Sequence, residues 1–222
     1  MEPTAERFVD DVQRLGADLR MRDLFALAKR DKDASPAEIQ KLWRHPADDV
    51  RLGAVSIMDF QARDRRTGPE RRRQLYDLYI ANHDRIDTWS MVDRAAPYVV
   101  GGYLWDKSRE PLFELARSPR PMERRTAIVA TYYFIRQHDL EDTFRIGEIL
   151  VDDPDELVQK AVGGWVREAG KQDLDRLRAY LDRFAATMPR TTLRYAVEHL
   201  DAAERRRYLE MKSESAGVAR GT

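Results

Sequence analysis

The sequence predicts an all-α protein, and two observations support this fold class. Apolar residues recur at helical spacing, as in Leu174, Leu177, Leu181 and Phe184, and no stretch has the alternation of a strand. Proline-containing pairs that precede Arg- and Ala-rich segments are spaced by multiples of about 35 residues, which is enough for a helix pair. These pairs are His45-Pro46, Ser118-Pro119 and Asp153-Pro154. We therefore expect a solenoid of antiparallel helix pairs with a concave face, which suits either a DNA duplex or a helix of a partner protein.

The expected elements can be placed in chain order. Met1–Arg20 is expected to form a short pair of capping helices. Ser35-Pro36-Ala37-Glu38 predicts a capping box with proline at the first helical position, and Asp153–Glu156 repeats this design. Between these starts we expect about a dozen helices, most of about 10 to 17 residues. Breaks between helices are predicted at Gly68-Pro69, Ser118–Pro121 and Met188-Pro189.

Composition predicts one domain over residues 1–212 and a disordered tail at Ser213–Thr222. The chain has no cysteine and only four histidines, which excludes disulfides and thiolate sites and argues against a metal centre. It has no leading apolar segment and no long apolar run. We expect a cytoplasmic protein, a monomer without cofactor or membrane contact.

The charge pattern leaves two interpretations open. Basic and acidic residues balance at 39 each, which argues against a strong overall field for nucleic acid. Most of the basic residues are arginines, which suit forked contacts with phosphate. Arginine clusters can therefore line a DNA-binding face or simply form solvated helix surfaces. They lie at Arg63–Arg66, Arg71–Arg73, Arg124-Arg125 and Arg205–Arg207.

One segment, Ile86–Asp93, carries a candidate site. Trp89 and Asp93 are four residues apart, so in a helix they share one face. An indole beside a carboxylate can hold a cationic group by cation–π and Coulomb attraction. The alternative is that Trp89 packs in the core and Asp93 pairs with Arg94 or Arg85.

Four blocks of sequence, in order and at similar distances, carry a resemblance to a known family. The chain between Met21 and Leu209 resembles the AlkD-like DNA alkylation repair glycosylases, which are HEAT-like repeat proteins. The blocks are Trp89–Pro97, Glu123–Arg136, Gln159–Lys171 and Met188–Ala196.

The resemblance implies a fold and an activity. It implies a HEAT-like repeat solenoid and a monofunctional glycosylase of base excision repair. Such an enzyme hydrolyses the N-glycosidic bond of cationic N3- and N7-alkylated purines in duplex DNA and leaves an abasic site. Trp89 and Asp93 match the residues that act at the deoxyribose, and Arg125 matches the functional arginine, with Arg124 as the fallback. Candidates for contacts with the DNA backbone are Lys160, Arg190 and Arg194.

The chain departs from the family in the third block, Gly163-Gly164-Trp165. Gly164 occupies the place of the family's second functional tryptophan, and Trp165 lies about 100° further around the helix. Either the helix is locally rewound so that Trp165 contacts DNA, or Trp165 packs in the core. This departure keeps two other functions open, a non-catalytic relative that binds DNA structure and a protein-binding repeat scaffold.

Overall fold

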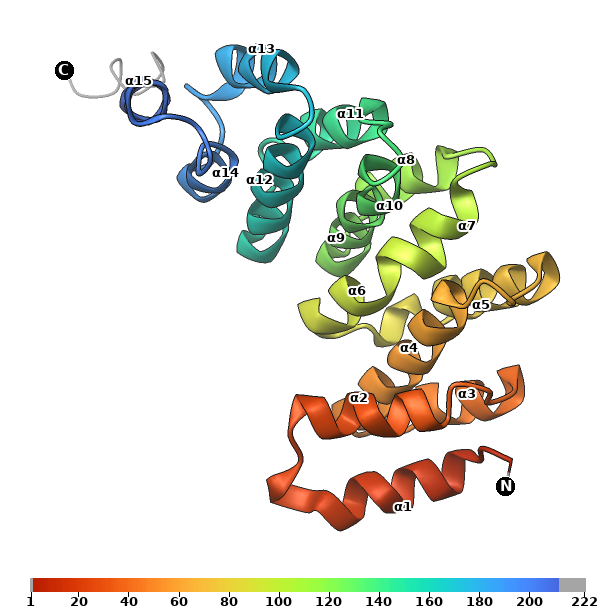
Figure 1. The fold of residues 1–222 in the computed structure, drawn as a ribbon. Coiled ribbons are helices and arrows are strands. Elements are labelled where there is room, and N and C mark those ends of the chain that lie inside the picture. Colours follow the sequence, from red (N-terminus) through yellow and green to blue (C-terminus); the bar gives the residue numbers. More distant parts are fainter. Residues whose placement is uncertain (1, 212–222) are drawn as a thin grey trace. The chain divides into compact units, whose positions relative to one another are not determined.

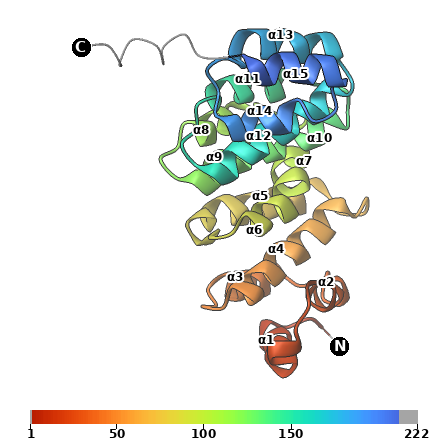
Figure 2. The ribbon, with the colours of Figure 1, turned by 90° about the vertical axis from the view of Figure 1, so that its left-hand side faces the viewer.

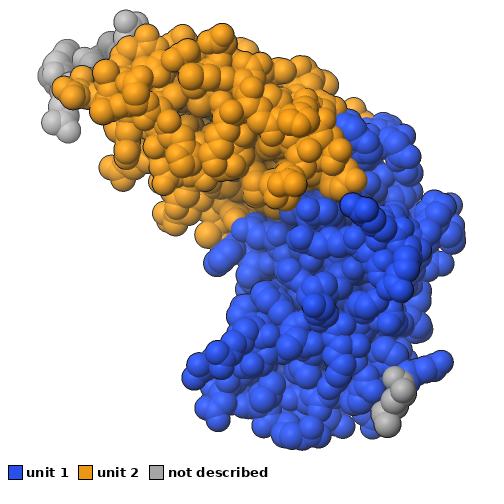
Figure 3. Space-filling model, viewed as in Figure 1, with its two compact units in different colours: residues 1–109 blue, residues 110–222 orange. Residues whose placement is uncertain are grey.

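The computed structural model describes residues 2–211, and this part of the chain contains helices, turns and loops but no strand. The all-α prediction is therefore confirmed. The chain divides into two compact units, residues 1–109 and residues 110–222 (Figure 3). The prediction of a single domain over residues 1–212 stays a prediction. The predicted tail, Ser213–Thr222, lies outside the described residues.

Unit 1 is organised around α4, which is buried along most of its length. Helices α2, α3 and α6 pack against α4, and α1 packs against α3 (Figure 1). The helices of this unit are α1 (Ala5–Leu15), α2 (Met21–Arg30), α3 (Pro36–Trp43), α4 (Asp48–Arg63), α5 (Pro69–Ala81), α6 (Trp89–Ala95) and α7 (Gly102–Leu104), with 3-10 turns at Gly16–Asp18 and His83–Arg85.

Unit 2 consists of helices that pack on their neighbours in sequence. Helix α8 packs on α9, α11 on α12 and α13 on α12, while α12 also packs against α9 and α14 (Figures 1 and 2). This local packing is compatible with stacked helix pairs. The helices are α8 (Glu110–Ala116), α9 (Pro121–Ala130), α10 (Tyr132–Ile135), α11 (Glu141–Ile149), α12 (Glu156–Gly170), α13 (Leu174–Phe184), α14 (Arg190–Ala196) and α15 (Ala202–Glu210).

The predicted helix starts are partly confirmed. Prolines occupy the first turns of α3, α5 and α9, and Met188-Pro189 precedes α14. Ser35 caps α3 by accepting a hydrogen bond from the Glu38 amide at 3.3 Å. The second half of the capping box is wrong, because the Glu38 carboxylate accepts from the Ala5 amide at 2.6 Å. This bond lowers the pKa of Glu38 and joins α3 to the first residue of α1.

Three other expectations need correction. Helix α12 is capped by Asp155, whose carboxylate accepts from the Leu157 and Val158 amides, so Pro154 lies outside the helix. Asp153 is instead engaged by Arg124. The N-terminal segment forms one helix and a 3-10 turn rather than a helix pair, because Gly16 ends α1 with a φ of 49°. Several helices are also shorter than expected, among them α8 and α14.

A π-helix over Ala96–Gly101 connects α6 to α7. Pro97 lies in its first turn and has no amide hydrogen for an α-helical bond. The Gly102 amide donates to the Pro97 carbonyl, five residues earlier, which is the bond of a π-turn. A wider turn therefore accommodates the proline without ending the run of helix that begins at Trp89.

Candidate functional site

Trp89 and Asp93 lie in unit 1 on α6, as the sequence predicts. Trp89 is the first residue of the helix and is 50% exposed, so the alternative that it packs in the core is wrong. Asp93 follows one turn later and is partly exposed. An exposed indole and a carboxylate thus share one face of a helix, the arrangement needed to approach a cationic group.

A buried ion pair anchors α6 to α4. Arg94, the residue after Asp93, has its Nη2 atom 3.2 Å from Oδ2 of Asp59, which is fully buried. The Arg94 guanidinium lies 4.5 Å from the centre of the Phe25 ring and 4.7 Å from that of Phe60. Burial raises the pKa of Asp59, and the nearby charge of Arg94 opposes this shift. Because successive residues are about 100° apart on a helix, holding Arg94 inward fixes the direction in which Asp93 points.

A second anchor holds the loop that leads into α6. Arg51 on α4 is buried and donates to the carbonyls of His45 and Pro46 at 3.0 and 2.6 Å. Its Nη2 atom also donates to Asp87 at 2.7 Å. Asp87 is two residues before Trp89, so α4 positions both ends of the segment that carries the candidate site.

Replacement of Asp87 by Ala is expected to loosen the start of α6. The Arg51–Asp87 hydrogen bond is charge-assisted but half exposed, so its loss should cost about 1 kcal/mol of unfolding free energy. Amide hydrogen exchange should accelerate at residues 88–92, at the start of α6, while exchange in α4 is unaffected. Asp84→Ala is the matched control, since Asp84 is exposed in the preceding turn. Equal exchange rates in the Asp87→Ala and Asp84→Ala variants would exclude an anchoring role for Asp87.

In unit 2 the family block on α12 places its two glycines in opposite environments. A Cβ atom at Gly163 would lie 2.4 Å from the Thr192 carbonyl oxygen and 2.6 Å from Cβ of Tyr195, so this glycine allows close packing of α12 on α14. A Cβ atom at Gly164 would have no atom of the described chain within 4 Å. Position 164, which the resemblance pairs with a functional tryptophan, therefore faces open space.

Trp165 differs from both predictions made for it. Helix α12 is a regular α-helix from Glu156 to Gly170, so the predicted local rewinding is wrong. The indole is partly exposed rather than buried in the core. Its ring lies against that of Tyr132, with 5.1 Å between the ring centres and 46° between the planes. Trp165 thus lies at the rim of unit 2 beside a second aromatic ring.

The two arginines of α9 are both engaged with the protein. Arg125 is buried and its Nη1 atom donates to the Leu157 carbonyl in the first turn of α12. Arg124 binds both carboxylate oxygens of Asp153, at 2.6 and 3.0 Å, and also donates to the Ser118 carbonyl. This ion pair raises the pKa of Arg124. The geometry assigns Arg124 to fixing the loop before α12 and Arg125 to fixing the first turn of α12, and a phosphate contact by either stays a prediction.

The candidate backbone contacts differ in how available they are. Lys160 pairs with Glu156 at 2.9 Å, which raises the pKa of the lysine. Arg190 donates to the Leu209 carbonyl at 2.6 Å. Arg194 is exposed and makes no ion pair or side-chain hydrogen bond with the described chain. Arg194 is therefore the best placed of the three to bind a phosphate.

Sequence reasoning missed Tyr195. This residue is 39% exposed on α14, next to Arg194 and across from Gly163 of α12. The residues around Tyr195 in the sequence do not show whether its ring is buried or exposed. The exposure depends on how closely α14 approaches α12. An exposed aromatic ring among cationic side chains suits stacking on a sugar or a base.

Several arginines of the predicted clusters hold the fold together, while others in the same clusters, such as Arg65, Arg73 and Arg205, lie on the exposed surface. Arg72 donates to three backbone carbonyls in and after α4, and Arg71 donates to Gln61 and to the Ala34 carbonyl. Arg63 binds Asp59 and lies over the Tyr98 ring at 3.9 Å. These guanidinium groups hydrogen-bond loops to helices. The number of arginines in the sequence is therefore larger than the number of guanidinium groups available on the surface.

The predicted residues thus divide between the two units. Trp89 and Asp93 lie in unit 1, while Arg125, Lys160 and Arg194 belong to unit 2 with Trp165 and Arg190. Among the described residues, no group of histidine, aspartate and glutamate side chains has the arrangement of a metal site. In the same part of the chain, no helix is long and apolar enough to cross a membrane.

Comparison with known proteins identifies the family. The family described as "DNA alkylation repair enzyme" matches residues 4–200. A search among curated proteins gave no match. The matched range includes all four sequence blocks and every candidate site residue. The chain belongs to the DNA alkylation repair enzyme family.

Proposed function

We propose that this protein is a DNA glycosylase that releases positively charged N3- and N7-alkylated purines from duplex DNA. The observation that carries this proposal is the exposed Trp89 beside Asp93 on α6 in a member of an alkylation repair family. The proposal includes a HEAT-like repeat arrangement with a concave DNA-binding face and a cytoplasmic monomer that acts in base excision repair.

The chemistry requires little from the protein. Alkylation places a positive charge on the base, so the glycosidic bond breaks with its electron pair going to a base that leaves neutral. The sugar becomes an oxocarbenium-like cation, water adds at C1′, and the water loses a proton. Asp93 supplies negative charge near the sugar and orients or deprotonates that water. The Trp89 ring packs on the sugar and attracts its developing charge. Arg125 holds an adjoining phosphate.

The open space at Gly164 favours a second candidate, a non-catalytic relative that binds DNA. Without a side chain at this position, one aromatic surface of the family's site is absent. Trp165, one position further around α12, lies against Tyr132. In this alternative the remaining cationic side chains bind duplex DNA but no base is released.

Base release from methylated DNA tests the proposal. Duplex DNA treated with a methylating agent is incubated with the protein, and released bases are resolved by chromatography. We expect 7-methylguanine and 3-methyladenine. Duplex binding without release supports the non-catalytic relative, and no duplex binding even at low salt supports a protein-binding scaffold.

Replacement of Arg194 by Ala is expected to weaken duplex binding and its dependence on salt. If Arg194 binds one phosphate, the slope of log affinity against log salt should fall by about one. Fluorescence anisotropy with a labelled duplex measures both quantities. Arg136→Ala provides the control, because Arg136 is also exposed in unit 2 but follows α10. An unchanged slope for Arg194→Ala would exclude this phosphate contact.

A further inference from the structure

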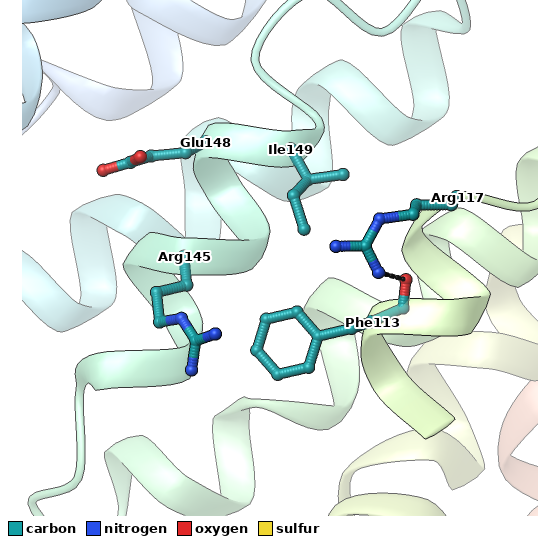
Figure 4. A pocket seen from close by; sticks show the side chains of 5 residues that line it. All are labelled: Phe113, Arg117, Arg145, Glu148 and Ile149. Atoms are coloured by element: carbon teal, nitrogen blue, oxygen red, sulfur yellow. Dashed lines mark hydrogen bonds between the residues drawn. The ribbon is translucent and has the colours of Figure 1, made fainter. Parts of the chain in front are cut away.

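A groove between α8 and α11 of unit 2 is lined by residues that the proposed function does not use. Its volume is about 370 Å³, which lies within the range of ligand-binding sites. Figure 4 shows the lining side chains, which come from α8, from the residue that follows it and from α11. They are Phe113, Arg117, Arg145, Glu148 and Ile149.

The floor of this groove is apolar. Ile149 is 38% exposed, one of the few large apolar side chains of the described chain that solvent reaches. Phe113 is largely buried, and its ring lies between Arg145 and Ile149 in Figure 4. An exposed isoleucine beside an aromatic ring offers a contact area for one apolar side chain of a partner.

The walls of the groove carry two guanidinium groups. Arg117 donates one hydrogen bond, from Nη1 to the Phe113 carbonyl at 3.0 Å, so its Nε and Nη2 donors stay available. The Arg145 guanidinium lies 4.5 Å from the centre of the Phe113 ring, and its ion pair with Asp142 is long, at 3.5 Å. The two groups lie on opposite sides of the ring (Figure 4).

The acidic residue in the lining does not neutralise these arginines. Glu148 binds Arg183 of α13 at 3.0 Å. In Figure 4 its carboxylate points away from Arg117 and Arg145. The donors that remain available around the apolar floor therefore come from the two arginines.

We propose that this groove docks an acidic peptide segment of a partner protein, with one apolar side chain on Ile149 and carboxylates on Arg117 and Arg145. Arginine binds carboxylates through paired N–H donors, and an apolar anchor between charged contacts is common in peptide recognition. A DNA duplex fits less well, because its phosphates would leave the apolar floor formed by Phe113 and Ile149 without a partner.

The groove is separate from the candidate DNA contacts. Arg125, Lys160 and Arg194 lie on α9, α12 and α14, whereas the groove belongs to α8 and α11. The docking proposal does not rest on the proposed function.

The test uses a fluorescein-labelled peptide of about twelve residues, made of aspartate and glutamate with a central pair of leucines. Fluorescence anisotropy with the full chain should show saturable binding. Arg117→Glu/Arg145→Glu should weaken binding by about tenfold or more, since two charge contacts become repulsive. Arg136→Glu should not change it. Replacing the leucines by serine should also weaken binding.

A charge-swap measurement distinguishes the loss of the two arginine contacts from misfolding of the variant. The Arg117→Glu/Arg145→Glu variant should bind a lysine-based version of the peptide more tightly than the wild type does, which a misfolded protein would not do. Three results would overturn the proposal: no saturable binding of the acidic peptide, equal binding by the double variant, or loss of duplex DNA affinity in the double variant with peptide binding unchanged.

Discussion

Asp93→Asn is expected to slow the release of 7-methylguanine by about tenfold or more, while duplex binding and thermal stability stay close to wild type. A tenfold loss corresponds to about 1.4 kcal/mol of transition-state stabilisation. Asparagine keeps the size of the side chain but removes the negative charge that opposes the oxocarbenium-like sugar. Single-turnover release from a methylated duplex measures the rate without interference from product dissociation.

Two further variants make this result specific. Asp84→Asn removes a carboxylate from an exposed turn of the same unit and should release bases at the wild-type rate. Trp89→Ala should lower both affinity and rate, because the proposed function places the half-exposed indole on the sugar. An unchanged rate for Asp93→Asn would exclude the catalytic role of this residue. A Trp89→Ala variant that changes only the melting temperature would exclude the contact of the indole with the sugar.

Alanine at the two adjacent glycines of α12 is expected to change stability in opposite directions. Gly163→Ala should lower the free energy of unfolding by about 1–3 kcal/mol, because its Cβ meets the backbone of α14, which cannot move aside cheaply. Gly164→Ala should raise it by about 0.5–1 kcal/mol, since alanine favours the helix and its Cβ meets no atom of the described chain.

Urea denaturation followed by circular dichroism measures both effects. Each variant serves as the control for the other, because the two substitutions are chemically identical and lie one residue apart. Loss of stability in Gly164→Ala would mean that position 164 is covered in solution. A neutral Gly163→Ala would mean that α14 is free to move away from α12.

The sequence predicted the elements better than their contacts. Helical periodicity and the prolines located most helix starts, because these signals act within one turn. The capping box at Ser35 failed in its second half because Glu38 found a partner more than thirty residues away, the Ala5 amide. A local motif cannot anticipate a competing partner that only the packing of α1 on α3 supplies.

The candidate site was predictable to a similar degree. The shared face of Trp89 and Asp93 follows from helical geometry alone. The exposure of Trp89, the engagement of Arg124 by Asp153 and the open space at Gly164 depend on neighbouring helices. The adjacent glycines of α12 look equivalent in sequence, and only the approach of α14 makes them different.

The π-helix between α6 and α7 has a consequence for aligning this chain with its relatives. A π-turn holds one residue more than an α-turn over the same stretch of helix. A relative with an uninterrupted α-helix here should therefore align with a one-residue gap within Ala96–Gly101, while the residues on both sides keep their register. Alignments that place this gap elsewhere will shift Tyr103, which stacks on Tyr76, or move Asp93 to the wrong column.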